Sequence, residues 1–568
     1  MGSSTREAAL LHPFARLALV GGLVLASFGT AGASSPDAPG DGMDADDILE
    51  WSFADGDVVV GIDGHYRVRA DASSAIPAYR TPAPASRTET LGLDAGTSLA
   101  HRLRLDPYAV LWEVLDLHVQ ADVLDGGIAA DTGDRRYLGF SDAPRRDDTR
   151  GLDVASTELR RAWLEWEAPF GLLRFGRQPS EWGLGVLAND GDGFESPFGD
   201  ELLGDTYDRV LFGTKPISIF RALVLGEEVS GDDDPLSLGF AYDFGVERDA
   251  ISKDGDALDQ YIVALLLEWD DASAGVYAVR REQEHADTLR PVALTPDPGF
   301  LDVWVVDTSG EIALPGVLPW AGVTLELAWE VAYAFGETNV VASPAISTPD
   351  EPFPVFDVRQ WGGVVRLGGA WDGGRLRLEV GHASGDANRL DDEVTDFRLH
   401  PDYNVGLILF EDLLASVTAA QTFNLVNQLG EGGPVPLLGA DFLASNGSVT
   451  NATYVFPTLW LEPTPALELR FGVLWARAAE DLVDPFNDIV LGSGGAGEIN
   501  FLGGDATKRD LGIEIDLGVH WTAWSQPGAE LRLGLEYGHL FPGEAFTDGR
   551  GRRIDDLDKV RALLTLEL

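Results

Sequence analysis

The hydrophobic pattern along most of this chain has a period of two. In residues 158–185, Leu164 and Trp166 fall on one side of an extended chain, and Arg161 and Glu165 fall on the other. A Pro-Phe-Gly turn then reverses the chain into a second alternating stretch. Alternation with period two is the pattern of a β-strand with one apolar and one polar face. The stretch therefore predicts a β-hairpin.

The same alternation recurs over most of the chain, and its segments are long. Strict alternation over about 9 to 12 residues is typical of a strand that crosses a membrane in a barrel, whereas strands of a sandwich usually have about 5 to 6 residues. We therefore predict an all-β fold, a transmembrane antiparallel β-barrel whose apolar face meets lipid. The clearest further examples are residues 58–70, 115–123, 261–269, 323–333 and 511–521.

The connections between these segments alternate between short turns and long polar stretches. Short periplasmic turns and long outer loops are the usual asymmetry of outer-membrane barrels. Counting gives about 19 candidate strands, but a bacterial single-chain barrel should have an even number. The alternation of loops fails between Tyr207 and Leu258, so we predict about 18 strands, with the miscount in that region. The short turns are at 169–171, 215–216, 372–374, 462–465 and 525–528, and the long stretches are 71–96, 125–156, 389–450 and 481–508.

The first 33 residues have the features of a secretory signal peptide. Arg6 and Arg16 supply positive charge, residues 17–28 form an apolar run, and residues 31–33 read Ala-Gly-Ala, a small-residue cleavage site. The apolar run is too short to span a bilayer as a helix. We predict a signal peptide over 1–33, a flexible acidic leader over 34–56 and a barrel over 57–568. Sec-type export would place that barrel in the outer membrane of a Gram-negative bacterium.

Composition excludes several classes of function. The chain has no cysteine, which rules out disulfides, thiolate metal sites and thiol nucleophiles. Its formal net charge of −52 disfavours nucleic acid as a partner, because phosphates need a basic face. Two interpretations of the charge remain open: an acidic surface that aids solubility, or a vestibule that attracts cations.

Charged residues on the polar face of the predicted strands would point into the lumen. Ladders of opposite charge could set a transverse field and select solutes; alternatively, they pair across strands and only keep the interior satisfied. The predicted pore-lining residues are Arg67, Arg69, Arg102, Arg104, Arg161, Glu165, Arg174, Arg177, Glu326, Glu330, Arg366, Arg377, Glu379, Glu514 and Asp516.

Arg177 needs a separate argument, because Leu173 and Phe175 place it on the lipid-facing side of its strand. Either the strand ends by Gly176, or a bulge at this glycine turns the arginine inward. We predict the bulge, which would make Arg177, Arg161 and Arg174 the first candidates for the constriction.

Three acidic clusters, at 190–193, 232–234 and 391–393, lie in the predicted outer loops. Carboxylates at this density suit a hard cation such as calcium. None of the clusters has the twelve-residue EF-hand pattern, so solvated charge is the favoured interpretation. Bound calcium would bridge the loops to lipopolysaccharide phosphates, and lipopolysaccharide and outer-membrane lipid are the expected partners. No other cofactor is predicted.

One enzymatic alternative comes from His382 and Ser384, which share the parity of Leu376 and Leu378. A base two residues from a hydroxyl on one strand face could activate that hydroxyl. The spacing resembles the His-x-Ser stretch of outer-membrane phospholipases. However, the asparagine that follows the serine in that family is absent, because Gly385 and Asp386 follow here.

Several motifs resemble the alginate-export and related outer-membrane porin family. Resemblance implies an 18-stranded monomeric barrel that carries a polysaccharide or small solutes, with arginines lining the pore. The matching residues are Arg161, Trp166, Phe170-Gly171, Arg174, Gly176-Arg177-Gln178, Trp182-Gly183, Asn189 and the stretches 381–386, 401–407 and 511–516.

The sequence therefore favours a passive, non-enzymatic outer-membrane channel for ions, small solutes or a polysaccharide. The alternatives are a barrel hydrolase that uses His382 and Ser384, and a structural or adhesive barrel whose acidic loops bind cations.

Overall fold

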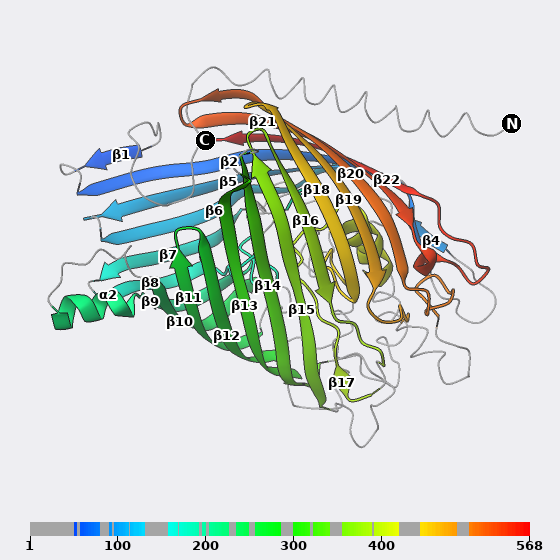
Figure 1. Ribbon diagram of the computed structural model, residues 1–568, viewed down its shortest axis with the longest axis horizontal. Coiled ribbons are helices and arrows are strands. Elements are labelled where there is room, and N and C mark those ends of the chain that lie inside the picture. The colour runs from blue at the N-terminus through cyan, green and yellow to red at the C-terminus, as the bar shows by residue number, and fades with distance from the viewer. Residues whose placement is uncertain are drawn as a thin grey trace.

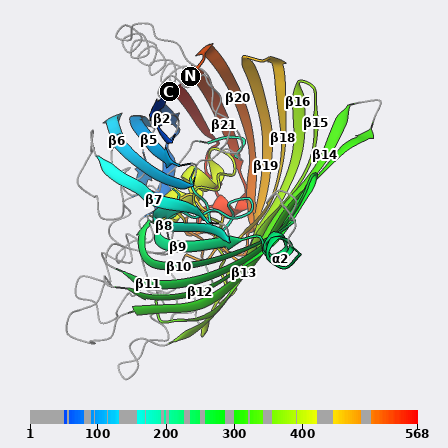
Figure 2. The same ribbon diagram turned by 90° about the vertical axis from the view of Figure 1, so that its left-hand side faces the viewer.

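The strands of this protein form one closed cylinder, which Figures 1 and 2 show in two views 90° apart. The computed structural model describes residues 50–53, 57–79, 90–93, 96–112, 114–130, 157–168, 170–191, 196–199, 204–225, 235–248, 256–285, 299–318, 322–340, 355–388, 391–419, 444–484 and 499–568. The predicted signal peptide lies outside these residues.

Within the described residues, 18 antiparallel strands make the wall, and each pairs with the next. The barrel closes where the last strand pairs with the first, from His65–Glu567 to Ser73–Lys559. The predicted antiparallel barrel is confirmed. In order around the wall the strands are β2 (Val58–Ser73), β5 (Gly96–Leu111), β6 (Leu115–Ala130), β7 (Glu158–Ala168), β8 (Gly171–Pro179), β9 (Thr206–Thr214), β10 (Leu236–Arg248), β11 (Ala257–Trp269), β12 (Ala272–His285), β13 (Gly299–Leu318), β14 (Val323–Thr338), β15 (Phe356–Trp371), β16 (Gly374–Ala383), β18 (Ala452–Thr464), β19 (Leu467–Ala478), β20 (Asp510–Gln526), β21 (Ala529–Pro542) and β22 (Leu557–Glu567).

Short strands and helical turns lie beside the wall or in the connections between its strands. β1 extends the edge of β2 beyond the end of β22, and β17 adds two residues beside β15. These elements are β1 (Glu50–Phe53), β3 (Ile76–Tyr79), β4 (Thr90–Leu93), α2 (Pro216–Phe220), η3 (Arg221–Leu225), β17 (Glu393–Val394), η5 (Leu409–Leu414) and η9 (Glu544–Phe546).

Two boundary predictions were wrong. The acidic leader was expected to be flexible through residue 56, yet Glu50–Phe53 pairs with β2 as an added strand. The connection after β9 was expected to be a tight turn at residues 215–216, but the chain forms α2 and η3 there before β10 begins. The apolar run at residues 217–225 is helical and adds no strand to the wall. It therefore accounts for the failure of loop alternation in this region.

The outer face of the cylinder is apolar and exposed. Phe175 is 59% exposed, Leu367 52% and Leu376 50%, and each lies on a strand whose alternate positions are less accessible. A protein that folds in water buries such side chains, whereas a membrane barrel turns them toward hydrocarbon. Exposed Trp166, Trp269, Trp361 and Trp521 belong to the same face. In the described ranges, no helix is long and apolar enough to cross a membrane.

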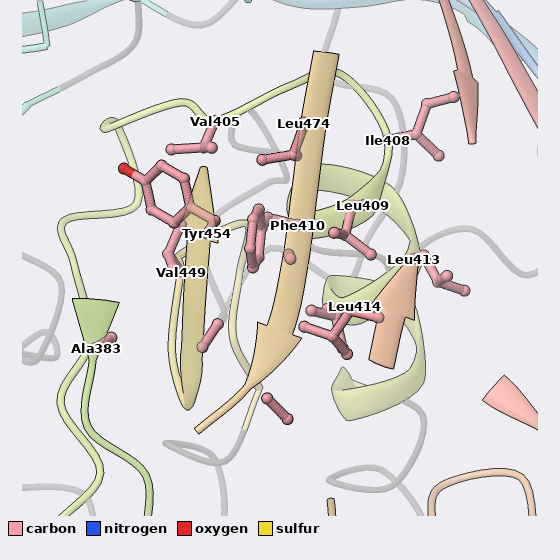
Figure 3. Close-up of a cluster of buried hydrophobic side chains, with 14 of the residues drawn as sticks. Ala383, Val405, Ile408, Leu409, Phe410, Leu413, Leu414, Val449, Tyr454 and Leu474 are labelled. Carbon is pink, nitrogen blue, oxygen red and sulfur yellow. The ribbon is translucent and has the colours of Figure 1, made fainter. Parts of the chain in front are cut away.

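The main cluster of buried apolar residues lies inside the cylinder and involves only part of its wall. Figure 3 shows Leu409, Phe410 and Leu413 of a helical turn packed against Tyr454 of β18 and Leu474 of β19. Loop residues supply much of this cluster, because the inner wall itself is mainly polar. The core of this barrel is therefore built where connecting segments fold inward.

Candidate functional site in the barrel lumen

A group of arginines covers the inner wall of β5, β6 and β7 around one carboxylate. Arg104 donates from Nε and Nη2 to the two oxygens of Asp122, at 2.9 and 3.3 Å. The Nε atoms of Arg160 and Arg102 lie 3.6 and 3.8 Å from the same carboxylate. All four side chains are buried. Because one negative charge faces three positive ones, this part of the lumen wall carries a net positive charge.

A second ion-pair group continues this basic wall across the closure of the barrel. Asp71 of β2 accepts from Arg561 Nε of β22 at 2.8 Å, and its other oxygen lies 3.1 Å from Arg69 Nε. Arg67, two positions earlier on β2, is also buried. The predicted residues Arg67, Arg69, Arg102 and Arg104 are thus brought together on adjacent strands.

Two successive arginines of β7 point inward because of a bulge. The β6–β7 ladder pairs Gln120 with Arg161 and Ala121 with Leu159, so Arg160 has no partner in the register. Leu159 stays on the outer face, 52% exposed, while both arginines are buried. Arg161 donates to the Asp190 carbonyl oxygen of an inward loop. A β-bulge re-aims side chains in this way, and period-two counting alone missed Arg160.

The predicted bulge in β8 is absent, and Arg177 does not line the lumen. The β7–β8 and β8–β9 ladders run through Gly176 and Arg177 without a register shift. Gly176 adopts φ 126° within this regular pairing. Arg177 therefore keeps the outward parity of Phe175 and donates to Asp208 at 3.0 Å. An ion pair on the outer face replaces the expected constriction residue.

Glu165 and Arg174, by contrast, lie on the inward register as predicted. Arg174 Nε donates to Glu165 at 2.6 Å, and its guanidinium lies 5.6 Å from the ring centre of Trp163. Trp163 in turn stacks on His118. Glu326 of β14 shares the inward parity of Glu330 and is partly buried. These groups line the lumen near the short-turn end of their strands.

One inward loop runs from β8 across the lumen. We call its described residues, 180–191, 196–199 and 204–205, the first inward segment. Glu330 on β14 accepts hydrogen bonds from the backbone N–H groups of Leu184, Val186 and Leu187. Farther along, Phe198 packs against Phe456 of β18. The segment therefore contacts the wall at two separate places.

A second loop enters the lumen between β16 and β18. Its described residues 397–419 and 444–451 form the second inward segment, whose helical turn lies within the ring of strands in Figure 2. Glu514 of β20 accepts from the backbone N–H groups of Leu407, Ile408 and Leu409, the last two at 2.8 and 2.7 Å. Lys559 of β22 donates to the Leu407 carbonyl oxygen at 3.0 Å.

The two inward segments also bind each other. Asp402 accepts from the Gly204 N–H at 2.7 Å, and His400 Nε2 lies 3.0 Å from Asp205 Oδ1. The His400 N–H donates to the Val186 carbonyl oxygen at 2.7 Å. The segments therefore form one inserted layer held by the wall on several sides.

The predicted residues Arg366, Arg377 and Glu379 form part of this attachment. Arg366 Nε donates to Glu379 at 2.8 Å, and its Nη2 donates to the Tyr403 hydroxyl of the second segment at 3.0 Å. Tyr454 donates to the same Glu379 at 2.7 Å. Burial raises the pKa of the Tyr403 hydroxyl, so this phenol stays neutral at physiological pH. These charged groups hold the inserted layer to the wall.

Glu411 is an acid in the second segment with an altered ionisation. Burial raises its pKa to about 8, while Lys559 and Arg561 act in the opposite direction. At neutral pH this carboxyl is therefore mostly protonated.

His382 and Ser384 do not form a catalytic pair. His382 Nδ1 lies 2.7 Å from the Thr453 hydroxyl, and its ring packs 4.3 Å from that of Trp361. Ser384 Oγ donates to the Thr395 carbonyl oxygen at 2.6 Å and accepts from the Trp361 and Phe397 N–H groups. The serine oxygen is thus engaged in holding the start of the inward loop. The geometry gives no support to the hydrolase alternative.

The calcium hypothesis gains no support from the described residues, among which no three His, Cys, Asp or Glu side chains converge as metal ligands would. Glu393 instead pairs with Arg359 at 2.8 Å, and Asp391 accepts the Glu393 N–H. The cluster at 232–234 lies outside the described residues.

Sequence reasoning missed the groups whose roles depend on loops. Asp307 and Lys559 carry the inward parity, but their partners Trp182 and Leu407 lie far away in the sequence. Period-two alternation predicts that both side chains point inward, but no local pattern in the sequence indicates which loop each one binds.

Comparisons with known proteins give only distant structural likenesses for this chain. No family model matches, and no curated protein matches, so the resemblance to alginate exporters is unsupported. Solved structures with a similar outline include OccAB1 of Acinetobacter baumannii (9% identity, TM-score 0.45, covering 89% of this chain and 96% of that one). OprD of Pseudomonas aeruginosa (10%, 0.44, 89% and 93%) and OccK9 of the same organism (11%, 0.46, 89% and 98%) are comparable. At these levels the fold assignment rests on the closed strand ladder of this chain itself.

Proposed function

We propose that this protein is a passive channel of a Gram-negative outer membrane. The observation that carries the proposal is a closed 18-strand wall, within the described residues, that is apolar outside and charged inside. Smaller barrels fill their interior with wall side chains, but barrels of 16 to 18 strands are wide enough for an aqueous passage. A polar inner face is compatible with a water-filled lumen.

The inserted layer supports passage of ions and small solutes over passage of a polysaccharide. Both inward segments cross the lumen and bury apolar side chains there, which reduces the open cross-section. The arginines around Asp122 would give that passage a charged wall without blocking it. Alginate export, implied by the sequence resemblance, is the less favoured form of the proposal. We also propose that the barrel is a monomer surrounded by lipopolysaccharide.

Swelling of proteoliposomes tests this proposal and its size limit. Purified barrel is reconstituted into lipid vesicles, which are then diluted into isosmotic solutions of amino acids, monosaccharides or a dextran. We expect swelling in the small solutes and none in dextran. Vesicles that swell in no solute, although the protein is folded and inserted, would contradict the channel and favour an adhesive or structural barrel.

A further inference from the structure

The two inward segments are fixed to the wall by the same device. Glu330 and Glu514 come from strands on different sides of the barrel, and each accepts three closely spaced backbone N–H groups of one segment. Both side chains are fully buried. A carboxylate that accepts several backbone N–H groups fixes a loop strongly, because these are charge-assisted hydrogen bonds. One glutamate therefore supplies a concentrated attachment point for each segment, in addition to its other contacts with the wall.

Each of these glutamates has a second buried carboxyl group against it. Asp307 lies diagonally across the β13–β14 ladder from Glu330, and Asp516 lies two positions from Glu514 on the same face of β20, so each aspartate is placed to hydrogen-bond to its glutamate. Both aspartates are fully buried. Two carboxyl groups can hydrogen-bond only if one of them carries a proton, and like charges at such short range in a dry site cannot both persist. One shared proton in each pair would satisfy both conditions.

Within the described residues, the hydrogen bonds that the first pair accepts come from neutral donors. Asp307 Oδ1 accepts from Trp182 Nε1 of the first segment at 3.0 Å, and its Oδ2 has no protein partner besides Glu330. Arg209 of β9, which like Asp307 lies near Tyr277 of β12, is already paired with Asp243 at 2.5 Å. The shared proton is thus the element that allows the two acids to coexist.

The second pair lies in a more charged environment. Glu536 of β21 and Lys559 of β22 both act on Asp516, while His520 lies 3.4 Å from Glu536. From the second segment, Asp412 lies 3.0 Å from Lys559 Nζ, and Glu411 is close enough for Lys559 to influence it. Lysine 559 is therefore shared among several acids and cannot neutralise Glu514 and Asp516 by itself.

We propose that Glu330 and Glu514 are positioning residues for the conduction path, and that Asp307 and Asp516 hold them in place through one shared proton each. The inference rests on the proposed channel function, and it states which residues determine the width of the passage. When hydroxide removes the shared proton as water, two negative charges remain in direct contact. The carboxylates separate, their bonds to the segment N–H groups are lost, and the inserted layer moves from the wall.

Single-channel conductance between pH 5 and pH 10 tests the proposal. In the wild-type barrel we expect a low conductance at acidic and neutral pH and a rise, or frequent larger steps, in alkaline solution. Asp307→Asn and Asp516→Asn replace the protonated aspartates with an amide that still donates to the glutamate but cannot ionise. Each single variant should show a smaller increase in conductance at alkaline pH than the wild type, and the double variant should show no increase.

Two further variants separate positioning from general stability. Glu330→Gln and Glu514→Gln keep the size of the side chain but remove the charge that binds the three N–H groups, so the larger conductance should appear already at neutral pH. Asp208→Asn is the matched control, because it removes an aspartate of the outer face. It should keep the wild-type profile.

Cysteine labelling gives a readout that does not need conduction. The chain has no native cysteine, so Leu187→Cys and Ala415→Cys each report on one segment of the barrel folded in detergent. Labelling should accelerate at alkaline pH in the wild-type background and stay slow beside Asp307→Asn or Asp516→Asn, respectively. Equal labelling rates at every pH, or identical rates with and without the asparagine, would overturn the proposal. An absence of conductance with pH-dependent labelling would instead count against the channel function alone.

Discussion

Asp122 is the carboxylate that Arg104, Arg160 and Arg102 share on the inner wall, and its removal gives a quantitative test. The side chain is 1% exposed and has Arg104, Arg160 and Arg102 within 2.9, 3.6 and 3.8 Å. Asp122→Asn preserves shape but removes the negative charge that these three buried guanidinium groups share. Removing one member of a buried ion pair costs about 3–5 kcal/mol, which corresponds to about a hundredfold or more in the folding equilibrium.

The matched comparison is Asp208→Asn, the same chemical change at an ion pair on the outer face. Arg177 lies 3.0 Å from Asp208, but both side chains are about a third exposed, at 29% and 32%. Both residues lie at the long-loop end of β8 and β9, away from the middle of the apolar face. A solvent-exposed pair contributes about 0.2–1 kcal/mol. Denaturant titration of both variants in detergent micelles, followed by tryptophan fluorescence and by heat-modifiable migration on gels, measures the difference. Similar midpoints for Asp122→Asn and Asp208→Asn would refute the burial argument.

The same substitution has a second expected effect, on ion selectivity. Asp122→Asn adds one unit of positive charge to the lumen wall, so its reversal potential in a salt gradient should shift toward anions. Asp208→Asn should leave the reversal potential unchanged, because Asp208 faces away from the lumen.

Three further outcomes are expected. Glu411 has a pKa of about 8 in the folded protein and an ordinary value of 4.5, so the folded state binds the proton more tightly. The stability that this proton contributes is complete below about pH 4.5 and is lost as the pH rises toward 8. A denaturation series from pH 5 to 9 should show this loss of stability in the wild type and a smaller loss in Glu411→Gln. Gly176→Ala should destabilise the barrel by about 1–3 kcal/mol, because its φ is 126° and a Cβ atom would lie 2.4 Å from the Ala162 carbonyl oxygen, whereas Gly316→Ala, at φ 71° with open space around it, should cost less in the same titration. Ser384→Ala should weaken attachment of the inward loop, measurable as faster proteolysis, while a phospholipid hydrolysis assay should show no activity in either wild type or variant.

The sequence predicted the wall of this barrel well, because period-two alternation follows directly from which strand face meets lipid. For the same reason, fourteen of the fifteen residues predicted to line the pore lie on the inward register, and their contact with a conduction path stays a prediction. Arg177 lies on the outward register, because the bulge that was added to the pattern is absent. The true bulge lies one strand earlier, at Arg160, where two arginines in succession give no period-two signal for it.

What those inward residues do could not be predicted, because it depends on contacts distant in sequence. Glu330 and Glu514 were expected to line an open passage, but each is covered by backbone N–H groups of a loop. Glu330 binds residues about 145 positions away and Glu514 binds residues about 106 positions away. Alternation specifies the face of a strand and carries no information about which loop folds onto it.

The channel itself is tested most directly by the current through single barrels in a planar bilayer, measured in a salt gradient. The structure predicts discrete, ohmic conductance steps with a reversal potential that differs from zero and moves when Asp122 is replaced. A folded, inserted barrel that gives no current at any pH would contradict the central claim.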